Sequence, residues 1–126
     1  MPNPHQALIM NYVQAYNAFD VDGMCRDLHQ DIHFENVSNG EVSLSLQGLA
    51  AFREQAEAAK GYFTERQQII DSVVEEEGHV TVHIKYKAVL AIDLPNGMKV
   101  GDTLEMDGQS IFEFIDGKIS HIRDVS

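Results

Sequence analysis

The sequence predicts one α+β domain over residues 1–126, with three helices packed against a strongly curved antiparallel sheet. Three apolar patterns with helical spacing fall in the first half of the chain. Long strand-like runs separated by turn signals fill the second half. A chain of 126 residues has the usual length of a single domain and can bury one core. Helices and strands segregated along the chain are typical of the α+β class.

Three helices are expected, all in the first half of the chain. Over residues 5–19, apolar residues recur at steps of three and four, which is the stripe of an amphipathic helix. Asp20 can cap a second, shorter helix that ends near Gln30. A third helix is expected over residues 48–60, where Gly61 is placed to end it. The first two helices should form a helical hairpin.

The first two strands are expected on either side of Asn39-Gly40, which is the strongest two-residue hairpin signal in the chain. Strand-like residues lead into this turn over residues 32–37. Apolar residues then alternate with polar ones over residues 42–46, as in a strand with one buried face. The sequence therefore predicts a β-hairpin between the second and third helices.

Four strand-like runs follow the third helix and predict an antiparallel meander. Three of them have 13 to 16 residues, far above the usual length of about five or six, so the sheet must bend. Gly101 and Gly108 are candidate kink points. The runs cover residues 64–76, 80–94, 100–115 and 118–125, and the turn signals between them are Glu77-Gly78, Pro95-Asn96-Gly97 and Asp116-Gly117.

The charge of the chain argues against two classes of partner. The sequence holds 20 acidic and 9 basic residues, which gives a formal net charge of −11 at pH 7. A field of this sign repels the phosphate backbone of a nucleic acid and an anionic membrane surface. We therefore expect neither nucleic acid nor a membrane as a partner.

A cytoplasmic location is expected from the absence of targeting signals. No stretch approaches the roughly 20 apolar residues that a membrane-spanning helix needs. The opening Met-Pro-Asn-Pro has neither the basic region nor the apolar run of a signal peptide. The single cysteine, Cys25, cannot form an intrachain disulfide, and its apolar neighbours favour a small buried side chain over a reactive thiol.

The combined pattern resembles the nuclear transport factor 2-like superfamily, most closely its SnoaL-like branch. The resemblance rests on the order of elements, on the hairpin, on Leu-Gln-Gly-Leu at 46–49 and on Phe-Glu-Phe-Ile-Asp-Gly-Lys-Ile-Ser-His-Ile-Arg-Asp at 112–124. It covers essentially the whole chain. It implies a cone-shaped, cystatin-like roll, often a homodimer through the sheet. Pockets of such folds serve ketosteroid isomerisation, polyketide cyclisation, limonene epoxide hydrolysis, dehydration and plain binding, so the fold alone does not select a function.

The resemblance also implies positions for acid–base chemistry. Isomerases of the superfamily carry a carboxylate near the end of the first strand and a hydrogen-bonding acid on the penultimate strand. These positions hold Asn36 and Ser110 here. Tyr16 lies on the first helix, from which family members often aim a hydroxyl into the pocket. Asp124 on the last strand is the best candidate for a general acid or base, because burial would raise its pKa.

Two other arrangements are less favoured. Arg123-Asp124 resembles the last strand of the epoxide hydrolase pattern, but Val89 stands where that pattern needs a second acid. The pair of carboxylates that would activate water and protonate the epoxide therefore lacks one member. Glu35 is an alternative base, although strand alternation places it on the face opposite Asn36.

The rest of the pocket wall is expected to be rich in aromatic and thioether groups, which suit a flexible apolar ligand. Two strand histidines are secondary candidates for proton transfer. The residues expected to contact the ligand are Tyr12, Phe34, Phe52, Phe112, Met106, His33 and His121.

Neither a metal ion nor another cofactor is expected. The six histidines show neither HxxxH nor HExxH spacing, and no cysteine cluster accompanies them. His33, His83 and His121 fall on different predicted strands. A metal site across three strands therefore stays open as a less favoured alternative.

Three functions are compatible with these residues. The first is an isomerase, cyclase or hydratase for a small apolar carbonyl compound, with Asp124 as acid or base. The second is a small-molecule binding domain without catalysis, favoured by Asn36 and Val89 at positions where catalytic patterns need acids. The third is a protein-interaction dimer. A homodimer through the convex sheet face is expected because three short helices cannot cover such long strands.

Overall fold

The computed structural model describes residues 4–95 and 97–126 and confirms the α+β class. Asn96, in the predicted turn between the two longest runs, lies outside the described residues. The elements in chain order are α1 (Pro4–Asn17), α2 (Val21–Arg26), β1 (Leu28–Ser38), β2 (Glu41–Gln47), α3 (Leu49–Ala59), a 3₁₀ turn (Lys60–Tyr62), β3 (Phe63–Glu76), β4 (His79–Leu90), β5 (Thr103–Ile115) and β6 (Lys118–Val125).

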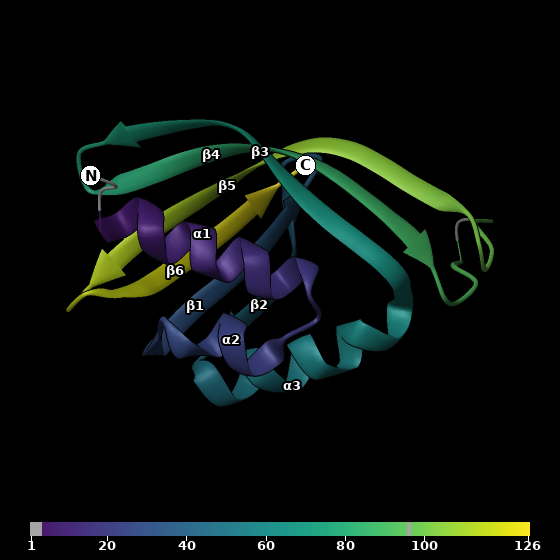
Figure 1. The fold of residues 1–126 in the computed structure, drawn as a ribbon, viewed down its shortest axis with the longest axis horizontal. Helices are drawn as coiled ribbons and strands as arrows, with labels where there is room; N and C mark the ends of the chain where they lie inside the picture. Colours follow the sequence, from purple (N-terminus) through teal and green to yellow (C-terminus); the bar gives the residue numbers. More distant parts are fainter. Residues whose placement is uncertain (1–3, 96) are drawn as a thin grey trace.

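The six strands form one sheet in the order β2-β1-β6-β5-β4-β3. The predicted hairpin and meander are both present, because β1 pairs antiparallel with β2 and the strands from β3 to β6 pair antiparallel in sequence order. The sheet as a whole is mixed, however, because β6 returns beside β1 and runs parallel to it (Figure 1). The expectation of a wholly antiparallel sheet was wrong at this one pair. The sequence carries local turn signals but no signal for which distant strands become neighbours.

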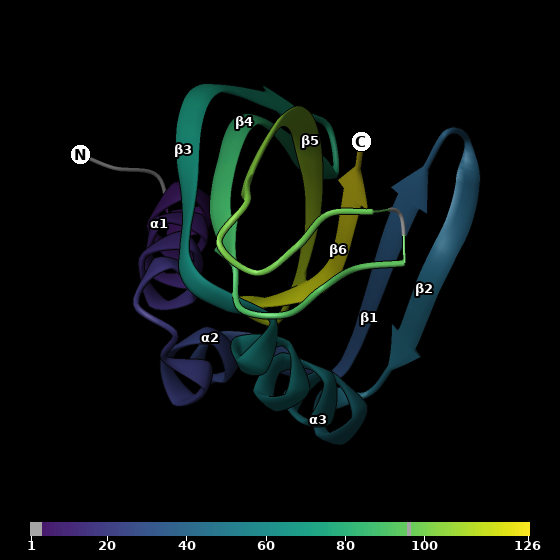
Figure 2. The same cartoon turned by 90° about the vertical axis from the view of Figure 1, so that its right-hand side faces the viewer.

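The sheet curls strongly, and the helices cover its concave side (Figure 2). The strand register shifts in the β1–β2, β1–β6, β3–β4 and β5–β6 pairs, where bulges allow long strands to bend. The predicted kink points behave differently from expectation. Gly101 lies in the turn before β5 with a φ of 90°, and Gly108 lies where a Cβ would approach the Val125 carbonyl oxygen to 2.8 Å. Gly108 is therefore required for close approach of β6, and the β4–β5 register passes through it without a bulge.

The second helix is shorter than predicted. It ends at Arg26, and β1 already begins at Leu28. Leu28 pairs with Ile119 of β6, and both side chains are almost fully buried. Pairing with a distant strand thus decides the conformation of a segment whose local spacing favours helix. The connection from β4 to β5 is likewise longer than predicted, because β4 ends at Leu90 and β5 begins at Thr103.

The core lies between the helices and the concave face of the sheet. It includes Ile9 and Val13 of α1, Val82 of β4, and Ile119 and Ile122 of β6, none of which is more than 4% exposed. Burying each aliphatic side chain of this size contributes roughly 1.5–3 kcal/mol before entropy is counted. None of the helices in the described part of the chain is long and apolar enough to cross a membrane.

Candidate functional site

A cavity of about 350 Å³ opens between the helices and the concave face of the sheet. Its apolar wall includes Phe52 and Ala56 of α3 and Phe34, Leu44 and Leu46 of the β1–β2 hairpin. Helix α3 presents this face because its apolar residues recur with helical spacing. The volume lies within the range of pockets that take small organic molecules.

Three polar side chains form a row across the middle of the sheet at one side of the cavity. In the register, Asp124 of β6 lies opposite Asn36 of β1 and opposite Ser110 of β5. All three line the cavity. The Ser110 hydroxyl donates a 2.6 Å hydrogen bond to Oδ1 of Asp124. Three residues that are distant in sequence are thereby brought together by strand pairing.

Asp124 is the ionisable group of this row. Burial raises the pKa of its carboxyl from 3.8 to about 6, and the hydrogen bond from Ser110 opposes that rise. The side chain keeps some accessible surface because it borders the cavity, but protein surrounds it closely enough to remove most of its hydration. A carboxyl with a pKa near 6 can both accept and return a proton near neutral pH.

A pair of tyrosines adds neutral hydrogen-bonding groups to the cavity. The hydroxyls of Tyr16 and Tyr86 are 2.8 Å apart and share one hydrogen bond. Burial raises the pKa of both phenols, most strongly for Tyr16. Each therefore stays protonated at neutral pH. One proton lies between the two oxygens, so the other remains for a bound molecule. Burial, reinforced by the Asp124 carboxylate, also raises the pKa of Tyr12.

Arg66 places a buried positive charge on the cavity wall. Its Nε donates a 2.9 Å hydrogen bond to the Tyr16 carbonyl oxygen, and its guanidinium lies 3.8 Å from the centre of the Tyr16 ring. The Phe19 ring lies 4.5 Å away. No carboxylate in residues 4–95 and 97–126 forms an ion pair with it. An electron-rich oxygen of a ligand would be favoured beside such a charge.

The structure brings together most of the side chains that sequence reasoning selected. Tyr86 and Arg66 were missed, because the inward face of β3 and β4 could not be assigned without the register. Tyr86 and Arg66 each share a strand face with core residues, and this alternation was the sequence feature that could have predicted that they point inward. The selected residues that line the cavity are Asp124, Tyr16, Asn36, Ser110, Tyr12, Phe34, Phe52 and Met106.

Three of the residues expected on the wall lie elsewhere. Phe112 is 1% exposed and packs its ring 6.1 Å from that of Tyr12 in the core, beyond the cavity. His33 and His121 lie on the outer face of the sheet. Alternation explains this, because Phe34 and Asp124 point inward and residues an odd number of positions away on the same strand point outward.

Comparison with known families agrees with the fold. Residues 9–122 match the family model described as a SnoaL-like domain. The chain belongs to the SnoaL-like family. This family assignment confirms the resemblance seen in the sequence, and it covers nearly all of the described elements.

Solved structures agree with this SnoaL-like assignment. A candidate polyketide cyclase from Xanthomonas campestris pv. campestris has a TM-score of 0.81 at 20% identity and covers 98% of this chain and 90% of its own. AclR, a candidate hydroxylase from Streptomyces galilaeus, has a TM-score of 0.74 at 23% identity, with coverage of 95% and 86%. A cystatin fold protein from Novosphingobium aromaticivorans has a TM-score of 0.74 at 19% identity, with coverage of 100% and 99%.

The low identities limit these similarities to the fold. No protein with a curated description matches the sequence. The function of this SnoaL-like domain therefore depends on its own side chains.

Proposed function

We propose that this SnoaL-like protein transforms a small, largely apolar carbonyl compound, with Asp124 as general acid and base. The observation that carries the proposal is a carboxyl with a pKa of about 6 on the wall of an apolar cavity. Such a group is poised to move protons near neutral pH. The fold shared with a candidate polyketide cyclase supports a reaction of the isomerase, cyclase or hydratase type.

The proton transfer begins at the Asp124 carboxylate. Its Oδ1 is held by Ser110, so Oδ2 accepts a proton from the carbon next to the substrate carbonyl. The electron pair of the broken C–H bond forms an enolate, and the negative charge develops on the carbonyl oxygen. Where the substrate is a β,γ-unsaturated ketone, the enolate is a dienolate, and protonated Asp124 returns the proton to its γ-carbon while the C=C bond moves beside the carbonyl, which completes an isomerisation. A cyclase would instead use the enolate carbon to attack a second carbonyl group.

The developing oxygen charge needs a donor, and the Tyr16–Tyr86 pair supplies one. The pair keeps one hydroxyl proton beyond the bond it makes internally. Arg66 adds positive charge on the same wall. Hydrogen-bond donors fixed in place before the reaction stabilise an enolate without reorganisation. Asn36, beside Asp124 in the register, would orient the substrate.

The test is hydrogen exchange at the α-carbon of bicyclic ketones such as 2-tetralone, followed by NMR in D₂O. We expect the wild-type protein to accelerate exchange and Asp124→Asn to reduce the catalysed rate by about a hundredfold or more. Asp116→Asn is the matched control, since Asp116 lies in an exposed turn, and it should leave the rate unchanged. Equal catalysed rates for wild type and Asp124→Asn would refute the assigned role.

A second candidate function is binding without turnover. Asn36 favours it, because an amide stands where isomerases of the superfamily carry their proton-accepting carboxylate. In that case ketones would bind to the wild-type protein, measured by calorimetry, with no accelerated exchange. Asp124→Asn would then change affinity only.

A further inference from the structure

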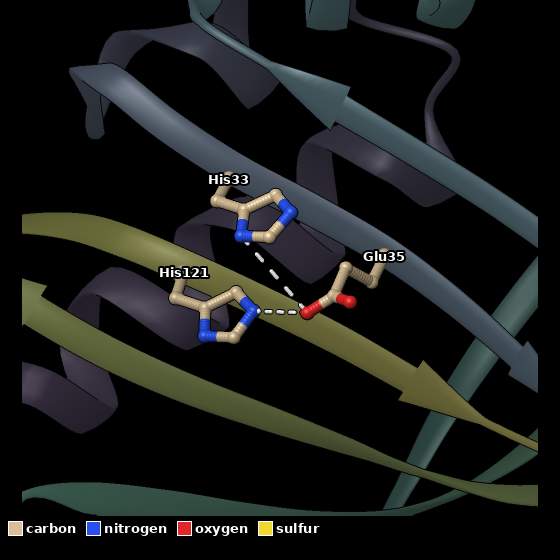
Figure 3. A group of neighbouring side chains, drawn as sticks. All are labelled: His33, Glu35 and His121. Carbon is tan, nitrogen blue, oxygen red and sulfur yellow. Dashed lines mark hydrogen bonds and ion pairs between the residues drawn. The ribbon is translucent and has the colours of Figure 1, made fainter. Parts of the chain in front are cut away.

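A compact group of ionisable side chains lies on the outer face of the β1–β6 pair, away from the cavity. His33 and Glu35 alternate with inward residues on β1, and His121 does so on β6. The parallel register sets His33 directly beside His121. Figure 3 shows the two imidazole rings side by side and the Glu35 carboxylate turned toward them. One nitrogen from each ring and one carboxylate oxygen lie within 4.8 Å of one another.

The nearer ring nitrogens converge on a single oxygen. His121 Nε2 is 2.7 Å from Oε1 of Glu35, and His33 Nδ1 is 4.0 Å from the same atom. In a tetrahedral zinc site with bonds near 2.0–2.1 Å, neighbouring ligand atoms are about 3.3 Å apart. One of the two distances is shorter than this and the other is longer. The third distance, between the two ring nitrogens, is at most 4.8 Å. Side-chain rotations that move each atom by about 1 Å would bring the three atoms toward tetrahedral spacing.

The far ring nitrogens are already engaged. His121 Nδ1 lies 2.6 Å from Oε2 of Glu113 on β5, and His33 Nε2 lies 3.1 Å from Oγ of Ser45 on β2. Metal-binding histidines nearly always have such a partner on the second nitrogen, often a carboxylate, which fixes the tautomer and ring orientation. Each ring is thus held by a hydrogen bond at its far nitrogen, and its other nitrogen faces Glu35.

Access and charge also suit a cation. The side chains of His33, Glu35 and His121 are 38%, 11% and 21% exposed, so an ion and its water could reach them. The net charge of −11 attracts cations to the surface. One group competes: Nη2 of Arg123 lies 3.4 Å from Oε1 of Glu35. The Arg123 side chain is 46% exposed and can swing into solvent.

We propose that His33, Glu35 and His121 bind one zinc-like divalent transition ion, with water completing the coordination. Two imidazole nitrogens and one carboxylate oxygen suit zinc and its neighbours, whereas calcium and magnesium prefer oxygen ligands alone. The sequence spacing did not reveal this site, because its ligands come from two strands that meet only in the sheet. The ion would fasten β1 to β6 on the face opposite the cavity wall. This proposal is independent of the reaction proposed above.

The test is a Zn²⁺ titration of the chelator-treated, untagged full chain, followed by calorimetry and thermal unfolding. We expect one saturable equivalent per chain and a higher unfolding temperature with the ion bound. His33→Ala and Glu35→Gln should weaken binding at least a hundredfold. Glu113→Gln should weaken it by about 10- to 100-fold, because it removes only the support of one ring. Arg123→Gln should retain or tighten binding, because it removes the competing charge.

The matched control is His83→Ala, which removes an exposed histidine of β4 and should leave zinc binding unchanged. Circular dichroism of each variant separates lost binding from lost folding, and Ca²⁺ should give no saturable heat. Anomalous X-ray scattering at the zinc edge would locate the ion between β1 and β6. Absence of a saturable equivalent in the wild-type protein, or equal affinity in the folded Glu35→Gln variant, would overturn the proposal.

Discussion

Strands β1 and β6 carry ionisable groups on both faces of the sheet, and the two faces differ in how these groups are partnered. On the inner face, Asp124 receives one hydrogen bond, from Ser110, and burial raises its pKa to about 6. On the outer face, the hydrogen bond from His121 lowers the pKa of Glu35, helped by the charge of Arg123 and opposed by partial burial. The carboxylates lie on adjacent strands, one residue apart in register. Burial therefore decides the direction of the pKa shift at Asp124, and the hydrogen bond from His121 decides it at Glu35.

The largest expected difference between the faces is in how the unfolding free energy depends on pH. The Asp124→Asn variant tests this dependence. Because the folded-state pKa of about 6 lies above the ordinary 3.8, the stability contributed by this carboxyl is complete below about pH 4 and is lost as the pH rises through 6. An amide cannot ionise. The variant should therefore exceed the wild type in unfolding free energy above pH 7 by about 3 kcal/mol at most, at ~1.4 kcal/mol for each pKa unit.

Urea unfolding of both proteins at pH 4 and pH 8 measures this effect. The gap in unfolding free energy should open only at the higher pH. A gap that is the same at both pH values would show that Asp124 has an ordinary pKa in the folded protein, and the contrast between the faces would then fail.

The next largest effect on stability is expected at Gly108, where β5 and β6 pack closely beside the row formed by Asn36, Ser110 and Asp124. In Gly108→Ala, the new Cβ would lie 2.8 Å from the Val125 carbonyl oxygen, a backbone atom that cannot simply rotate away. We expect a loss of about 1–3 kcal/mol in unfolding free energy. Gly61→Ala is the matched control, because nothing lies within 4 Å of its added Cβ. Equal unfolding midpoints for the two variants would contradict close approach at Gly108.

The smallest effect is expected on the outer face, from Glu35→Gln measured with a chelator present. The substitution removes the charge that His121 and Arg123 face, and should lower the unfolding free energy by about 1 kcal/mol at pH 7. Because the pKa of Glu35 is lowered from 4.5, its contribution is present above that pH and is lost as the pH falls. Glu41→Gln, at an exposed position of β2, is the control. A gap that grows toward acid pH would refute the assignment.

Much of the fold followed from local signals in the sequence. The Asn39-Gly40 turn fixed the first hairpin, and β6 has the predicted bounds because a clear turn precedes it. Local signals failed at Leu28, where a distant strand overrides a helical spacing. They also could not show that β1 and β6 run parallel, since neighbouring strands far apart in sequence leave no mark on either segment.

The candidate site could be predicted from the sequence only where it was clear which residues of a strand point toward the cavity. Asp124, Asn36 and Ser110 were selected one at a time from a family pattern, and pairing of their strands makes them a row. His33 and His121 were assigned to the cavity together with Phe34 and Asp124, although strand alternation separates each histidine from its inward neighbour, and both were therefore placed on the wrong face. Arg66, a buried cation among rings, was overlooked because the inward face of β3 could not be assigned without the strand register.

The position of β6 between β1 and β5 has a consequence for the order of folding. Before β6 is added, the sheet consists of two separate pieces, the β1–β2 hairpin and the three strands β3 to β5. Joining them requires contacts between residues about ninety positions apart, which form slowly because loop closure must come first. Asp124 arrives on the same strand that joins the pieces. Asp124 supplies the carboxyl on the wall of the cavity, so the proposed proton transfer requires the finished sheet.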